Sequence, residues 1–151
     1  MLTNLILGLS VMAACLTLQA LLVATAMRYY LRHIHLLKST AFGSSLALIT
    51  GVMFLLVIGN CLQIAIWAAL FRLVGEFSTF AEAFYHSAVN FATLGYGDIV
   101  MSDAHRLLGP LEAVNGVLMI GVSTAALMTA FQDVVTKTVA ARRAAGNDST
   151  A

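Results

Sequence analysis

Apolar residues dominate three long stretches of the chain, and these stretches predict helices that cross a membrane. Two of them, Leu5–Met27 and Leu46–Leu70, contain no charged residue. Each exceeds the roughly 20 residues that a helix needs to span a hydrocarbon core about 30 Å thick. A third run, Leu111–Phe131, follows Pro110, and proline suits the first turn of a helix. We therefore expect three membrane-spanning helices.

The first run has an alternative interpretation as a cleaved signal peptide. Such a peptide begins with basic residues, whereas Met1–Asn4 is neutral, and its apolar core is shorter than this run. We expect residues 1–27 to form a retained membrane helix.

The positions of the basic residues predict the orientation. Six of the eight Lys and Arg residues follow the first or the third run: Arg28, Arg32, Lys38, Lys137, Arg142 and Arg143. Basic residues concentrate on the cytoplasmic side of membrane proteins, so the amino terminus should lie outside. Residues 28–45 are then expected to form an amphipathic linker along the inner leaflet, and residues 133–151 a cytoplasmic, partly disordered tail.

Composition excludes several classes of protein. Hydrophobic residues make up 60% of the chain and charged residues 10%, which is too apolar for a small water-soluble domain. A net charge of +1 provides no basic surface for nucleic acid. Cys15 and Cys61 lie in apolar runs and form no disulfide or metal-binding pattern, and no nucleotide-binding or catalytic motif is present. We expect neither an enzyme nor a resident cofactor.

A short segment between the second and third runs does not fit a simple loop. Thr79 and Glu82 have the spacing of a capping box, which predicts a helix over Phe80–Ala92. At about 1.5 Å per residue this helix is too short to cross the membrane. It leads into Thr93–Asp98, with the sequence TLGYGD, where two glycines end the helix. Non-helical backbone at membrane depth must be buried in protein or line a water-filled path, which predicts a re-entrant pore loop.

The residue types in this loop suit a partly dehydrated cation. Backbone carbonyls can replace water around the ion without a fixed charge that would hold it in place. Gly95 and Gly97 can adopt the dihedral angles that turn successive carbonyls to one side. Leu94 and Tyr96 would point away from the ion, and Thr93 would add a hydroxyl group. Because each chain offers one carbonyl at each level, a ring of ligands requires several chains around one axis.

The TLGYGD segment, placed between a short helix and a third crossing, closely resembles the selectivity filter of two-transmembrane pore-loop potassium channels. The resemblance implies a pore domain over residues 46–132, with an outer helix at 46–71, a pore helix at 80–92 and an inner helix at 110–132. Residues 1–27 would be an additional helix outside this domain. The implied fold is an all-α membrane protein with three transmembrane helices and a re-entrant pore loop, assembled as a homotetramer in the lipid bilayer around a K⁺ path.

The same resemblance assigns roles to individual residues. The carbonyls of Thr93, Leu94, Gly95 and Tyr96 would coordinate K⁺, with the Thr93 hydroxyl at the innermost site. Further residues would support the filter: Gly97, Asp98, Tyr85, His86, Val89 and Asn90. On the inner helix, Gly116 would be a hinge, although close helix packing explains a glycine there equally well, and the cavity and gate would be lined by Ile120, Thr124 and Met128.

The chain departs from the usual family pattern in the residues around the filter. Asn90 and Ala92 stand where many members have threonine, and Tyr85 and His86 replace an aromatic pair. Val89 replaces a carboxylate that some members pair with the filter aspartate. These departures leave a weakly selective cation channel, or a non-conducting membrane subunit, as alternatives to a K⁺-selective channel.

Three polar residues near the loop have competing interpretations. His86 could sense external pH through Asp98, but we favour a neutral, packed histidine. Glu112 should be solvated near the start of the third helix, where the helix dipole favours a carboxylate. Asn115 should face protein, because an amide in lipid is costly. The sequence does not indicate a gating stimulus, and we expect a bacterial plasma membrane as the location.

Overall fold

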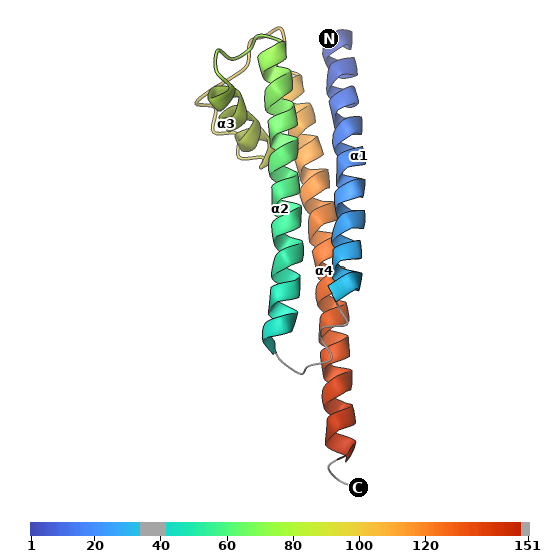
Figure 1. Cartoon of the computed structure of the whole chain (residues 1–151). Coiled ribbons are helices and arrows are strands. Elements are labelled where there is room, and N and C mark those ends of the chain that lie inside the picture. Colours follow the sequence, from blue (N-terminus) through green and yellow to red (C-terminus); the bar gives the residue numbers. More distant parts are fainter. Residues whose placement is uncertain (34–41, 149–151) are drawn as a thin grey trace. The chain divides into compact units, whose positions relative to one another are not determined.

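The computed structural model describes residues 1–33 and 42–148, with side chains over 1–33 and 46–140. It contains four helices: α1 (Leu2–His33), α2 (Phe42–Leu73), α3 (Phe80–Phe91) and α4 (Leu108–Asp148) (Figure 1). Over these described residues there is no strand. Helices α1, α2 and α4 are long, and the short helix α3 lies between α2 and α4 in the sequence.

Three of these helices are long and apolar enough to cross a membrane. The candidate spans are Leu2–His33, Leu46–Leu73 and Leu108–Ala140. Their apolar side chains are mostly exposed on the single chain, because lipid is the solvent that suits them. The expected all-α membrane fold, with three spanning helices and one short helix, is therefore confirmed.

The first of two compact units consists of Met1–Leu21 and Ile58–Val122, and it contains α3 and the TLGYGD segment. Its core surrounds Trp67 and Phe71, both fully buried on α2. The rings of Phe71 and Phe77 meet edge to face at 6.3 Å. Around them pack Cys15 from α1, Ala83 from α3, and the other buried members of this cluster: Ala68, Leu70 and Leu108. The core thus joins α1, α2, α3 and the start of α4 to the segment that follows α3.

Within this unit, α1 and α4 lie side by side in one direction and in a constant register. Asn4 Nδ2 donates a hydrogen bond to Ala104 O, just before α4, at 2.5 Å, and Gln19 Nε2 donates to Met119 O at 3.4 Å. The sequence separation is 100 residues in both pairs. Gly8 lies at the same register, because a Cβ placed on it would be 3.4 Å from Leu108. A parallel pair of helices keeps such a separation constant along its length.

The second unit consists of Leu22–Val57 and Ser123–Ala151 and has its own apolar core. That core contains Tyr30, whose hydroxyl donates to Asp133 Oδ2 at 2.5 Å, and Val52 and Val134 lie around it. Lys137 also donates to Asp133, at 2.8 Å. Tyr30 and Lys137 thereby supply hydrogen-bond donors to the Asp133 carboxylate, which lies inside a spanning segment.

Two boundaries differ from the sequence-based expectation. Helix α4 does not end near Gln132 but continues to Asp148. Residues 133–148 of the expected tail are therefore helical. Residues 133–148 contain no proline and are rich in alanine over 140–145, and Asp133 pairs with Lys137 at i, i+4, so the helix continues. Helix α1 likewise continues past Met27 to His33. The rest of the expected amphipathic linker, residues 34–41, lies outside the described residues.

Candidate functional site

The helix that carries the re-entrant segment begins with a complete capping box. Thr79 Oγ1 accepts a hydrogen bond from Glu82 N at 3.2 Å, and Thr79 N donates to Glu82 Oε2 at 3.3 Å. Ser78 Oγ adds a third bond to Glu82, at 2.9 Å. The bonds from Ser78 and Thr79 lower the pKa of Glu82 below its ordinary value. The predicted capping box is confirmed, and local residues alone fix where α3 begins.

The TLGYGD segment leaves α3 with an alternating backbone. Helix α3 ends at Phe91, and φ is positive at Thr93 (59°), Gly95 (58°) and Gly97 (73°), but not at the residues between them. Alternation of left- and right-handed dihedral angles turns successive peptide groups to the same side. Glycine adopts positive φ at little cost, whereas the β-branched Thr93 does so only under strain. A left-handed threonine was not expected from the sequence.

Two large side chains of this segment are uncovered on the single chain. Leu94 is 54% exposed and Tyr96 is 66% exposed. No atom of the described residues lies within 4 Å of a Cβ placed on Gly95 or Gly97. The segment thus has a free side for further protein or for an ion.

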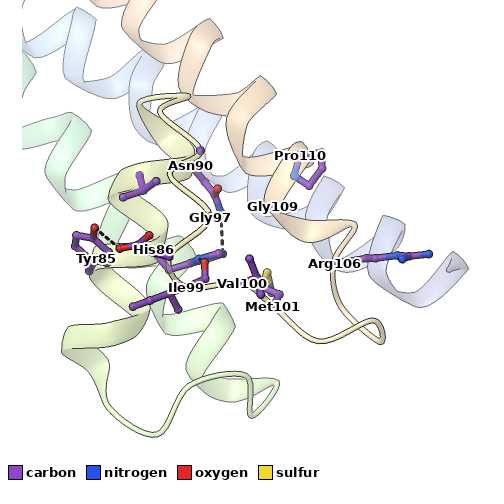
Figure 2. A pocket seen from close by; sticks show the side chains of 13 residues that line it. Tyr85, His86, Asn90, Gly97, Ile99, Val100, Met101, Arg106, Gly109 and Pro110 are labelled. Carbon is purple, nitrogen blue, oxygen red and sulfur yellow. Dashed lines mark hydrogen bonds between the residues drawn. The ribbon is translucent and has the colours of Figure 1, made fainter.

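Tyr85 on α3 holds the carboxylate that follows the glycines. Its hydroxyl donates to Asp98 Oδ2 at 2.7 Å, and Figure 2 shows this bond beside the open pocket of about 290 Å³ behind the segment. The hydrogen bond from Tyr85 lowers the pKa of Asp98 below its usual range, and the same bond raises the pKa of Tyr85. Asp98 is therefore ionised and oriented by the pore helix.

His86 is packed as a neutral histidine. Asn90 Nδ2 lies 2.8 Å from His86 Nε2 and can only donate, so Nε2 accepts and Nδ1–H donates to Ile99 O at 3.0 Å. The ring also stacks on Phe77 at 4.9 Å and meets Phe71 edge to face at 5.6 Å. Burial lowers the pKa of His86 below its ordinary value. This arrangement favours a neutral, packed His86 over the alternative in which His86 and Asp98 together sense pH.

One glycine of α4 lies directly against the end of α3. Gly116 lies against the backbone of Phe91, the last residue of α3, and a Cβ on Gly116 would meet the Phe91 carbonyl oxygen. Val89, two residues earlier on α3, is buried. The remaining residues expected on the cavity side of α4 are spaced four apart and are exposed on the single chain: Ile120, Thr124 and Met128.

A second cluster connects the loop before α3 to the loop after the TLGYGD segment. Glu76, whose side chain is only 7% exposed, accepts from Ser102 N at 2.7 Å and from Ser102 Oγ at 2.6 Å. His105 Nδ1 lies 2.5 Å from Glu76 Oε1, the same oxygen that accepts from Ser102 Oγ. Burial works against the charge of Glu76, but the bonds from Ser102 and His105 outweigh it and lower the pKa.

Glu76→Gln should destabilise the outer loops at neutral pH and remove part of their acid sensitivity. Because the pKa of Glu76 is lower in the folded chain than its ordinary value of 4.5, the ionised carboxylate stabilises the fold at pH values above 4.5. This stabilisation disappears as the pH falls through the pKa that Glu76 has in the folded chain. Loss of the bonds to the carboxylate should cost about 1–3 kcal/mol. Thermal unfolding of the purified protein between neutral pH and about pH 3 measures both effects.

The control is Asp103→Asn, because the Asp103 side chain is 94% exposed and its ion pair with Arg106 spans 3.1 Å at the surface. We expect less than about 1 kcal/mol from this change. An equal loss from both substitutions would show that the Glu76 cluster does not stabilise the loops.

Several polar side chains are buried where the helices of this unit meet, and the sequence indicated only that of Asn115. Gln63 Nε2 donates to Gln19 Oε1 at 2.7 Å. Glu112 is fully buried against Ser87, so the expectation of a solvated carboxylate was wrong. Its position in the first turns of α4 favoured solvation, but the packing of α3 against α4 covers it. Asn115 is also fully buried, which confirms that it faces protein.

The buried residues thus surround a short capped helix and an alternating loop in a chain with three spanning helices. Residues 60–133 match a family model described as an ion channel. The match supports an ion-channel function for this segment, and with the three apolar helices it makes the chain a multi-pass membrane protein. It begins within α2 and excludes α1. No curated protein and no solved structure matches the chain.

Proposed function

We propose that the chain is the subunit of a homotetrameric, potassium-selective channel that lets K⁺ pass down its electrochemical gradient without catalytic turnover. The observation that carries the proposal is the backbone of TLGYGD, with positive φ at Thr93, Gly95 and Gly97, at the end of a short helix. This loop lies inside the segment that matches an ion-channel family.

Ion coordination would come from backbone carbonyls. In the proposed tetramer, one carbonyl from each chain forms a ring at each level, and the rings of Thr93, Leu94, Gly95 and Tyr96 replace the hydration shell of K⁺. The Thr93 hydroxyl completes the innermost ring. The carboxy-terminal end of α3 carries partial negative charge, which favours a cation near Thr93.

The uncovered side chains support an assembly of several chains. Tyr96 and Leu94 are each more than half exposed next to glycines with free space on the single chain. Neighbouring subunits would cover both side chains and hold the loop at a fixed width. Support within the chain comes from Tyr85 on Asp98 and from His86 on Ile99.

The proposed orientation places the amino terminus outside and the carboxy terminus in the cytoplasm of a bacterial plasma membrane. Arg28 and Arg32 lie at the end of α1, and Lys137 lies near the end of the third span. Both groups fall on the side that the positive-inside rule assigns to the cytoplasm.

Ion flux from liposomes tests the proposal directly. Purified protein, checked for its oligomeric state, is reconstituted with K⁺ inside, and efflux is compared with efflux of Na⁺ under equal gradients. We expect a tetramer that releases K⁺ at least about 100-fold faster than Na⁺, as a filter of carbonyl rings would require.

Two other outcomes would replace the proposal. Similar rates for both ions would indicate a weakly selective cation channel, as the unusual residues Asn90 and Ala92 allow. A stable tetramer without flux of either ion, at several pH values and lipid compositions, would indicate a non-conducting subunit.

A further inference from the structure

The hydroxyl group of Ser87 on α3 lies between two oxygen atoms. Ser87 Oγ is 2.8 Å from Ile64 O on α2 and within hydrogen-bond distance of Glu112 Oε1 on α4. A hydroxyl group has one proton, and a backbone carbonyl can only accept. Ser87 can therefore donate to Ile64 or to Glu112, but not to both.

Both contacts are hydrogen bonds only if Glu112 supplies the second proton. The carboxyl O–H of Glu112 then donates to Ser87 Oγ, and the Ser87 hydroxyl donates to Ile64 O. With an ionised Glu112, one of the two oxygen pairs would face each other at short range without a proton between them, which is repulsive.

Burial leads to the same conclusion. Glu112 has no exposed surface, and the ion pairs found among the described residues do not include it. Its second oxygen, Oε2, has no hydrogen-bond partner there. An isolated carboxylate in such a place is far more costly than a neutral acid.

The groups around Glu112 provide no compensating charge. Helix α1 contributes the thiol of Cys15, and α2 contributes the Ile64 carbonyl. Helix α3 contributes the Ser87 hydroxyl and the Asn90 amide, with the neutral ring of His86 behind the amide. On α4 itself, the buried neighbour one turn on is the uncharged Asn115.

Contacts run from Glu112 to the end of the filter. The amide of Asn90 lies against Glu112 and donates to His86, and His86 donates to the carbonyl of Ile99, the residue after Asp98. Ser87 connects the same carboxyl group to α2. Glu112 therefore stands where α2, α3 and α4 meet behind the TLGYGD segment.

We propose that Glu112 is a protonated positioning residue that fixes the pore helix, and through it the filter, to the inner helix. Loss of its proton at alkaline pH places a charge in this buried site, separates α3 from α4 and lowers K⁺ flux. The effect on flux rests on the proposed channel function, whereas the protonation of Glu112 does not.

Infrared spectroscopy of the full chain in liposomes measures the proton without any flux. A protonated carboxyl group has a carbonyl stretching band above the amide region, and deuterium exchange shifts it. We expect this band at neutral pH in the wild type and in Glu82→Gln, and its loss in Glu112→Gln. Glu82 is the matched control because it is exposed and its pKa is lowered. A wild type without the band, or a band that persists in Glu112→Gln, would overturn the proposal.

Flux measurements then test the positioning role. Glu112→Gln keeps a neutral donor for Ser87, so K⁺ flux should stay within about twofold of the wild type and become insensitive to alkaline pH. Glu112→Leu keeps the volume but loses the donor, and flux should fall at least about tenfold. Where the leucine variant yields no tetramer, Ser87→Ala removes the oxygen that receives the Glu112 proton, together with the bond to Ile64 O, and should cause the same loss.

The outcomes separate the two proposals. Equal flux in Glu112→Gln and Glu112→Leu, or wild-type flux that does not decline at alkaline pH, would overturn the positioning role. A wild-type chain that shows the infrared band but passes no ion contradicts the channel function and leaves the neutral acid established.

Discussion

Liposomes that contain Gly95→Asp should release K⁺ no faster than protein-free liposomes, although the protein folds and assembles normally. Aspartate tolerates positive φ better than most residues, so the 58° at Gly95 should cost only about 1 kcal/mol. No atom of the described residues lies within 4 Å of the new Cβ. The side chain would therefore fit beside the proposed ion path, where a fixed charge and added volume would disrupt the carbonyl rings.

Gly75→Asp is the matched control for this substitution. Gly75 also has positive φ (81°) and open space around it, but it lies in the loop between α2 and α3. The backbone strain is comparable, while the distance from the TLGYGD segment along the chain is 18 residues or more. Normal flux from Gly75→Asp beside no flux from Gly95→Asp would assign the effect to the ion path. Wild-type flux in Gly95→Asp would contradict the proposed filter.

Gly116→Ala should weaken the folded protein strongly. The new Cβ would overlap the carbonyl oxygen of Phe91, and a backbone atom cannot move aside as a flexible side chain can. Overpacking of this kind costs about 1–3 kcal/mol, and here we expect the upper end. Thermal unfolding of the purified protein, with the fraction of tetramer as a second readout, measures the loss.

Gly121→Ala serves as the opposite case on the same helix. Nothing lies within 4 Å of a Cβ at Gly121, so alanine should raise the stability of α4 by about 0.5–1 kcal/mol. A hinge at Gly116 would give a different pattern, with unchanged stability in Gly116→Ala but altered channel opening. The contact between α3 and α4 thus makes close packing, rather than bending, the testable role of Gly116.

Features that depend on neighbouring residues could be read from the sequence. The Thr79–Glu82 capping box places the start of α3 because each partner lies within one turn of the other. The three spans followed from apolar length, which the membrane itself dictates. The unusual dihedral angles within TLGYGD were expected at Gly95 and Gly97, since only glycine adopts such angles freely.

Features that depend on tertiary packing could not be read in this way. A glutamate near the start of a helix is usually solvated, and only the contact with Ser87 shows that Glu112 is buried. Tyr85 was expected near the filter, but its bond to Asp98 depends on how the loop returns toward α3. The positive φ of Thr93 contradicts the preference of a β-branched residue, and it accompanies the two backbone bonds that close α3, from Thr93 N to Asn90 O and from Leu94 N to Val89 O.

The register of α1 against α4 has a consequence for biosynthesis. The partners of Asn4 and Gln19, namely Ala104 and Met119, are made 100 residues later. At translation rates of about 5–20 residues per second, the first helix waits roughly 5–20 s in the membrane before its amides meet their final acceptors. Gln63 arrives earlier and can pair with Gln19 in the interval. The order of emergence from the ribosome thus allows a two-helix intermediate in which Gln19 and Gln63 are already paired when α3 and α4 are made.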